Sequence, residues 1–104
     1  MEINMDKILN LISIATKAGK VKTGEFLTTK TLQEGLAHLV IIATDTSEKS
    51  TKRLIGISEN YECKSIVYGT KEELGKFTGK KEKSVIVITD KGFSDAILKK
   101  IENK

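Results

Sequence analysis

Residues 35–45 read Gly-Leu-Ala-His-Leu-Val-Ile-Ile-Ala-Thr-Asp, and the fold class can be inferred from them. Its centre, residues 39–43, is an unbroken apolar run with turn-forming residues on both sides. A short apolar run with such boundaries is typical of a β-strand that is buried on both faces of a sheet. A sheet with two buried faces needs helices on both sides, so the stretch favours an α/β fold.

The residues on either side of this strand alternate between helical and extended patterns. Residues 5–17 carry apolar side chains at the i, i+3, i+4, i+7 spacing of a helix buried on one face, with Asn4 as its cap and Gly19 as its end. The other expected strands are a weak one at 20–22, one at 65–68 and one at 84–89. Two further helices are expected before residue 65: one is capped by Thr23 and ends near residue 34, and the other is capped by Thr46 or Ser47 and reaches residue 61. A short helix follows Thr70, with the Thr70–Glu73 capping box, and a last helix is capped by Asp90 and reaches residue 101.

Strands that alternate with helices predict the architecture of the whole chain. Crossover connections of this kind produce a parallel or mixed sheet with helices on both faces. We therefore expect one domain, residues 1–104, built as a three-layer α/β/α sandwich with a small mixed sheet of about four strands.

The composition excludes most kinds of catalytic and metal site. Cys63 is the only cysteine, so an internal disulfide and a cysteine-based zinc site are excluded. His38 is the only histidine, so a catalytic histidine has no second histidine to assist it. A structural or surface role is expected for both residues, and a cap or turn role for Asp45. No phosphate-loop, dinucleotide or nucleophile-elbow motif is present. We expect no enzyme activity, no cofactor, no metal and no small-molecule substrate.

Charge and hydropathy indicate the kind of partner and the compartment. The net charge is +4, with 18 basic and 14 acidic residues, which permits binding to nucleic acid but is also common in proteins without such a ligand. The longest apolar run, residues 39–43, is too short to span a bilayer, and no secretory signal pattern opens the sequence. We therefore expect no membrane partner and a cytoplasmic location.

A first candidate binding segment covers residues 20–30. Lys22 and Thr23 precede a predicted helix start at Gly24, and Lys30 follows inside the helix. The first N–H groups of a helix and its positive dipole end suit a phosphate, and glycine lets an RNA backbone approach closely. Glu25 could accept hydrogen bonds from base amino groups or could complement the helix dipole. The plainer interpretation of the segment is a capped helix with a solvated lysine.

A second candidate segment covers residues 69–83. Gly75 lies inside a predicted helix, where glycine costs about 1 kcal/mol relative to alanine and so suggests tight packing. Gly79 is expected to end this helix, and Lys80 and Lys81 then follow in a basic loop that could contact phosphates. Taken alone, the loop would more often be only solvated charge. Aromatic residues are 5% of the chain, which argues against recognition based mainly on stacked single-stranded bases.

Together these blocks resemble a known family. Gly24, Lys30 and residues 35–45 are similar to the G-x-N-E-x-T-K…G-x-A-K-L-V-x-I-A-x-D signature of the kink-turn RNA-binding ribosomal proteins of the L7Ae and L30e types. Residues 61–63 and 69–79 resemble the later P-Y…S-K-x-x-L-G-x-A-x-G segment. The similarity spans nearly the whole chain, and the size and short N-terminal helix make it most similar to the bacterial YlxQ-like branch.

The resemblance implies an α/β/α domain that grips the bent, G·A-paired internal loop of a kink-turn RNA. It implies contact through the start of the second helix and through the loop that follows the L-G-x-A-x-G segment. The family's Asn-Glu pair is absent, because Phe26 and Leu27 stand at those positions and Glu25 lies one place earlier. The expected RNA-binding residues are Lys22, Thr23, Gly24, Glu25, Phe26, Leu27, Lys30, Thr78, Gly79, Lys80 and Lys81.

Two functions of different classes follow. The first is a non-catalytic protein that binds a kink-turn or similarly structured RNA, ribosomal or regulatory, in association with the ribosome. The second is a protein-interaction module with the same fold that has lost RNA binding, for which Phe26 and Leu27 would form an apolar patch. Copurifying nucleic acid that is lost at high salt would distinguish the first from the second.

Overall fold

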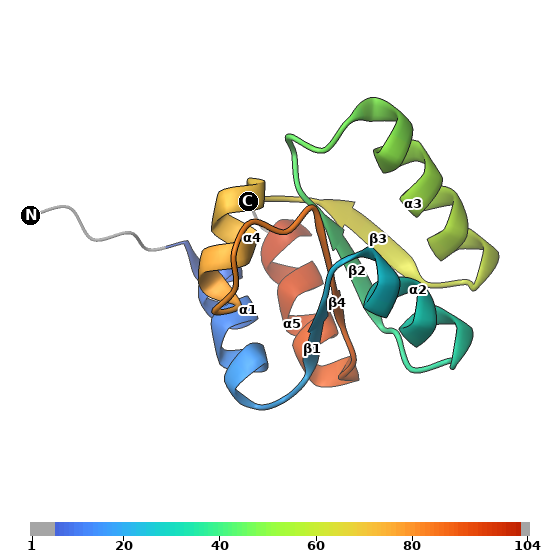
Figure 1. The fold of residues 1–104 in the computed structure, drawn as a ribbon. Helices are drawn as coiled ribbons and strands as arrows, with labels where there is room; N and C mark the ends of the chain where they lie inside the picture. Colours follow the sequence, from blue (N-terminus) through green and yellow to red (C-terminus); the bar gives the residue numbers. More distant parts are fainter. Residues whose placement is uncertain (1–5, 103–104) are drawn as a thin grey trace, which may run out of the picture.

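The computed structural model describes residues 6–102, and within this range helices and strands alternate along the chain (Figure 1). The elements are α1 (Lys7–Lys17), β1 (Val21–Thr23), α2 (Glu25–Gln33), β2 (Leu39–Ile42), α3 (Glu48–Asn60), β3 (Lys64–Val67), α4 (Lys71–Phe77), β4 (Val85–Ile88) and α5 (Lys91–Glu102). Each predicted strand and helix is present with ends within about two residues of the expected positions.

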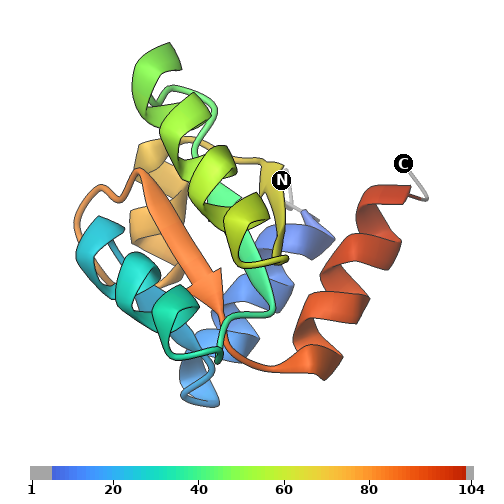
Figure 2. The same cartoon turned by 90° about the vertical axis from the view of Figure 1, so that its right-hand side faces the viewer.

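The strands form one mixed sheet in the order β1-β4-β2-β3. Strands β2 and β3 are parallel, whereas β4 runs antiparallel to both β1 and β2. Helices α2 and α3 cover one face and helices α1, α4 and α5 cover the other, as Figures 1 and 2 show from two directions. The prediction of a three-layer α/β/α sandwich with a small mixed sheet is confirmed.

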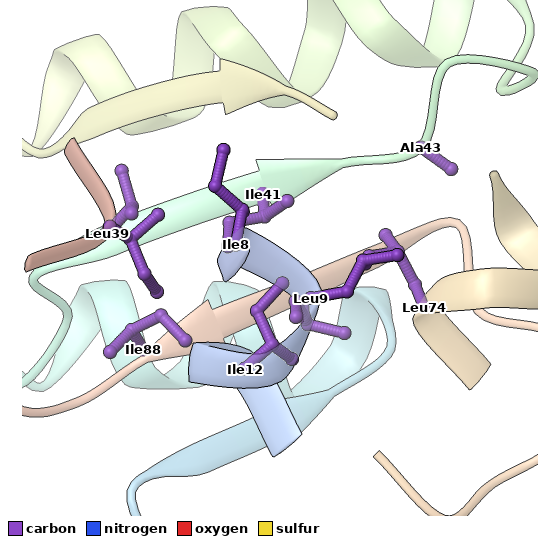
Figure 3. Close-up of a cluster of buried hydrophobic side chains, with 10 residues drawn as sticks. Ile8, Leu9, Ile12, Leu39, Ile41, Ala43, Leu74 and Ile88 are labelled. Carbon is purple, nitrogen blue, oxygen red and sulfur yellow. The ribbon is translucent and has the colours of Figure 1, made fainter. Parts of the chain in front are cut away.

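The two central strands carry the core of both layers. All residues of β2 and β4 are buried, and their side chains alternate between the faces as the pleat requires. Leu39 and Ile41 join Ile8 and Ile12 of α1 in the cluster drawn in Figure 3. Val40 and Ile42 point the other way, into the cluster beneath α2 and α3. The apolar run of residues 39–43 is therefore buried on both faces, as its sequence predicted.

The N-caps of α1 and α2 are Asp6 and Gly24. The predicted cap Asn4 lies outside the described residues, and the carboxylate of Asp6 caps α1 by accepting a hydrogen bond from the Leu9 N–H at 2.9 Å. The prediction that Thr23 caps α2 is wrong, because Thr23 is the last residue of β1 and Gly24 is the N-cap. Thr23 still pairs with β4, and the chain turns only at Gly24, with φ 92° and ψ 163°.

The other predicted caps are present. Ser47 caps α3, whereas the hydroxyl of Thr46 donates to the Ser84 carbonyl at 3.2 Å. The capping box of Thr70 and Glu73 at the start of α4 is complete. The carboxylate of Asp90 accepts a hydrogen bond from the Phe93 N–H at 2.9 Å at the start of α5.

The sheet topology gathers several connections at one end of the molecule. Strands β1, β2 and β3 end where β4 begins, because β4 is antiparallel to its neighbours. The N-termini of α2, α3 and α4 therefore lie at the same sheet end as the loop of residues 78–84. In residues 6–102, no helix has both the length and the apolar character needed to cross a bilayer.

Candidate functional site

The two candidate segments meet at this end of the sheet. The backbone N–H of Gly24 donates to the carbonyl of Val85 at 2.9 Å. The start of α2 is thus joined to the first residue after the loop of residues 78–84, the lysine loop. The next residue back, Ser84, accepts a hydrogen bond from the Ala43 N–H at 2.8 Å. One end of the sandwich therefore carries both segments.

The N-terminus of α2 has no side-chain cap. Gly24 has no side chain to accept hydrogen bonds, so the first N–H groups of α2 have neither an intrahelical acceptor nor a capping side chain. Phe26 and Leu27 in this first turn have 78% and 38% of their surface exposed. Lys22 and Lys30 are exposed on β1 and α2. The helix start therefore offers a positive dipole end with an exposed aromatic ring and lysines nearby.

A salt bridge that the sequence did not reveal crosses this end of the molecule. Both carboxylate oxygens of Glu25 accept hydrogen bonds from the guanidinium of Arg53 in α3, at 2.7 and 3.1 Å. These hydrogen bonds, aided by the opposite charge, hold the pKa of Glu25 below its usual value although partial burial acts against them. Arg53 also donates to the Ser50 hydroxyl at 3.2 Å. A guanidinium has five N–H donors, so these three hydrogen bonds leave Arg53 with donors that they do not use.

The lysine loop is seated tightly on α4. A Cβ added at Gly75 would lie 2.1 Å from the carbonyl oxygen of Lys81, which confirms the tight packing predicted from this glycine. The N–H of Lys80 donates to the Gly75 carbonyl at 2.8 Å, and the N–H of Lys83 donates to the Lys71 carbonyl at 3.1 Å. The backbone of the loop is thus fixed, while the side chains of Lys80 and Lys81 are exposed.

Two other candidate residues of this loop have different surroundings. Thr78 is buried, and its hydroxyl donates to the carbonyls of Leu74 and Gly75 at 2.7 and 3.1 Å. Its side chain therefore shapes the end of α4 instead of facing a ligand. Gly79 is exposed and has φ 73°, a left-handed conformation that favours glycine and ends the helix as expected.

The residues considered for catalysis lie in structural or remote positions. The carboxylate of Asp45 accepts the Lys71 N–H at 2.8 Å and so has the predicted capping role. His38 and Cys63 line a hollow of about 580 Å³ at the opposite end of the sheet, with both acidic and basic neighbours such as Glu62 and Lys91. Burial raises the pKa of the Cys63 thiol, which disfavours the reactive thiolate. In the described part of the chain, no group of His, Cys, Asp and Glu residues is arranged to hold a metal ion.

Fold and site together define a small α/β/α domain that presents an uncapped helix start and a lysine loop at one sheet end. A sequence profile of the "Ribosomal protein L7Ae/L30e/S12e/Gadd45 family" matches residues 6–98. The chain belongs to this family.

Relatives of known sequence and structure agree with this assignment. The chain is 36% identical over 101 residues to the RNA-binding protein YlxQ of Enterococcus faecium, and this alignment covers 97% of each chain. It is 28% identical over 88 residues to the RNA-binding protein YlxQ of Bacillus subtilis (strain 168), with coverage of 85% of this chain and 88% of that one. A protein of unknown function from Bacillus halodurans has the same fold, with a TM-score of 0.87, 33% identity, and coverage of 92% of this chain and 97% of that one. A 15.5-kDa RNA-binding protein of Giardia lamblia shares the fold with a TM-score of 0.75 at 22% identity, covering 99% and 94% of the two chains.

Proposed function

We propose that this protein is a non-catalytic RNA-binding protein that recognises kink-turn or similarly structured RNA, ribosomal or regulatory, in association with the ribosome. The observation that carries the proposal is the joining of an uncapped helix start to a lysine loop through the 2.9 Å hydrogen bond between Gly24 and Val85. Two relatives named RNA-binding protein YlxQ, one of them 36% identical over nearly the full length, support it.

Each part of the site has a proposed role. The N–H groups at the start of α2 receive a phosphate, and Gly24 leaves room for the RNA backbone beside them. Lys30 reaches a guanine edge, while Lys80 and Lys81 contact phosphates across the bend of the RNA. Phe26 offers a ring face to an unpaired base of the internal loop.

The salt bridge changes the role proposed for Glu25. In place of direct contact with base amino groups, the carboxylate holds Arg53 next to the helix start. Arg53 then adds to Lys22 and Lys30 a further cation, which comes from a distant part of the sequence. The Asn-Glu pair of the family is absent here, so recognition depends more on the shape of the RNA backbone and less on hydrogen bonds to the G·A pairs.

A titration with two RNAs tests the proposal. One RNA carries a kink-turn and the other has its G·A pairs replaced by Watson–Crick pairs, at one fixed moderate salt concentration. We expect the protein to prefer the kink-turn. Equal affinity would contradict kink-turn recognition and leave a binder of RNA backbones, and binding of neither RNA would contradict the proposal as a whole.

Lysine variants assign the affinity to the two segments. Lys30→Ala is expected to cost about 1–3 kcal/mol of binding and to narrow the preference for the kink-turn. Lys80→Ala and Lys81→Ala are each expected to weaken the binding of both RNAs by the same factor. Each should also lower the slope of log K against log salt by about 1. Lys99→Ala, in α5, is the matched control and should bind like the unchanged protein.

A protein-interaction module is the second candidate, and exposed Phe26 and Leu27 are the observation that favours it. Protein purified at low salt distinguishes the two functions. Copurifying nucleic acid that salt removes supports RNA binding, whereas a nucleic-acid-free protein with a stable protein partner supports the module.

A further inference from the structure

A groove of about 510 Å³ lies between α2 and α3. Figure 2 turns these two helices toward the reader. Its charged lining residues are both cations, and the others carry amide, hydroxyl or apolar groups or are glycine. The lining residues are Thr29, Gln33, Lys52, Arg53, Gly56, Ile57, Asn60 and Tyr61. A groove with cations and hydrogen-bonding groups but without lining carboxylates suits a polyanion.

The groove is continuous with the proposed RNA site through Arg53. This arginine lines the groove and is also ion-paired with Glu25, the residue that follows Gly24. From Arg53 to Tyr61 the groove follows α3 for on the order of 12 Å, at about 1.5 Å per helical residue. A strand of RNA that leaves the proposed site therefore has an open path of a few nucleotides along the surface.

Gly56 is a second feature, independent of charge, that indicates a binding groove. It lies in the interior of α3, where glycine weakens a helix relative to alanine. Neither usual reason for a glycine applies to it, because its φ is not positive and an added Cβ would meet no atom within 4 Å. Instead, Gly56 forms part of the groove wall. A glycine that the protein's own packing does not require allows a ligand to approach the backbone of α3 closely.

The far end of the groove carries an aromatic side chain. Tyr61 has 43% of its surface exposed although it immediately follows a helix that packs on the sheet. An exposed aromatic ring stacks on an unpaired base, whereas the paired bases of a duplex are already stacked on one another. Lys52 provides a cation for the backbone, and Gln33 and Asn60 provide amide groups for hydrogen bonds.

We infer that the groove between α2 and α3 binds a single-stranded RNA segment of a few nucleotides that extends from the structured RNA. The inference rests on the proposed function and adds a second subsite to it. Phosphates of this segment lie near Lys52 and Arg53, the chain passes over Gly56, and one unpaired base stacks on Tyr61.

A comparison of blunt and extended RNAs tests the subsite. The probes are a blunt kink-turn RNA and the same RNA with a four-nucleotide single-stranded extension at either end, measured by fluorescence anisotropy. We expect an extension at one of the two ends to tighten binding about tenfold, from one stacked base and the added phosphate contacts. Gly56→Leu, Tyr61→Ala and Lys52→Ala should lose most of this gain and still bind the blunt RNA like the unchanged protein.

Two controls separate loss of the groove from loss of folding. Gly56→Leu places a better helix former at an open position, so its melting temperature should equal or exceed that of the unchanged protein. Lys99→Ala removes a lysine from α5 and should keep the full gain from the extension.

The outcomes distinguish this inference from the proposed function. Binding of the blunt RNA without a gain from either extension would overturn the groove subsite and leave the proposed function intact. Retention of the gain in all three groove variants would also overturn it. Failure of the unchanged protein to bind blunt and extended RNA would overturn both.

Discussion

Helices α2 and α4 begin at the same end of the sheet, yet their N-termini are completed in opposite ways. At α4, the Thr70 hydroxyl accepts the Glu73 N–H at 3.1 Å, and the Glu73 carboxylate accepts the Thr70 N–H at 3.0 Å. The Asp45 carboxylate accepts a further N–H, from Lys71, at 2.8 Å. At α2, the N-cap is Gly24, which has no side chain to accept a hydrogen bond from the helix start.

The difference shows which helix start is available to a ligand. Two carboxylates already occupy the positive end of α4, so a phosphate there would meet like charge and find its donors in use. The start of α2 has the same dipole without these acceptors, and its nearest carboxylate, Glu25, is neutralised by Arg53. Two helix starts at the same sheet end therefore differ in their free donors, because internal acceptors occupy those of α4.

The largest expected effect is a loss of stability from a substitution in α4, where Gly75 supports the lysine loop. Gly75→Ala places a Cβ against the Lys81 backbone, and we expect it to destabilise the protein by about 2–3 kcal/mol through forced movement of the loop. Gly56→Ala is the matched control, because its Cβ has open space and should stabilise the fold by up to about 1 kcal/mol. Urea unfolding measures both, and equal stability of Gly75→Ala and the unchanged protein would show that the loop is not seated on α4.

Gly24→Ala tests the start of α2 directly. A non-glycine residue at φ 92° is strained, so we expect a loss of about 1–2 kcal/mol in stability together with a several-fold loss of RNA affinity. Gly35→Ala, at φ 73° after the other end of α2, is the control with a positive φ away from the site. Thermal unfolding should show a loss of stability in both variants, whereas an RNA titration should show that Gly35→Ala keeps its RNA affinity. An equal drop in the RNA affinity of both variants would show that the loss comes from the weakened fold and not from the start of α2.

Thr70→Ala tests the capped helix start in the same way. Loss of an N-cap hydroxyl costs about 1 kcal/mol of stability, and we expect this cost without a change in RNA affinity, because α4 does not offer its N-terminus to the ligand. Chemical denaturation and an RNA titration give the two values. If Thr70→Ala weakened RNA binding as much as Gly24→Ala does, the contrast between the two helices would not hold.

The smallest effect concerns the salt bridge beside Gly24. Because the pKa of Glu25 is lowered in the folded protein, its contribution to stability is fully present above the usual carboxyl value and is lost as the pH falls through the lowered one. The difference in unfolding free energy between the unchanged protein and Glu25→Gln should therefore shrink on acidification. It is small throughout, because the Arg53 and Glu25 side chains are 46% and 41% exposed. A difference that stayed constant down to a pH of about 2 would exclude the salt bridge as its source.

The layers of the fold could be predicted because their signals are local. The apolar run of β2 required two covered faces, and the Thr70–Glu73 box marked the start of α4. Gly75 indicated close packing from its position in a helix alone, although its contact, the Lys81 backbone, could not be named. Sequence patterns confined to one helix or strand therefore predict that element correctly.

The parts that could not be predicted depend on contacts between distant segments. The cap of α2 was misassigned because pairing of β1 with β4 keeps Thr23 in the sheet, and the sequence does not give the strand order. The bridge between Glu25 and Arg53 spans 28 positions and two helices, so no local spacing signals it. Burial of Thr78 likewise follows from how its loop folds back on α4.

The most direct test of a two-segment RNA site is a backbone amide NMR titration of the ¹⁵N-labelled protein with kink-turn RNA. We predict that the amide signals of residues 25–27 and residues 79–83 shift together, at the same RNA concentration, while those of residues 62–64 and 91–95 at the opposite end of the sheet stay in place. Shifts confined to one of the two segments, or gathered at the opposite end, would contradict the account.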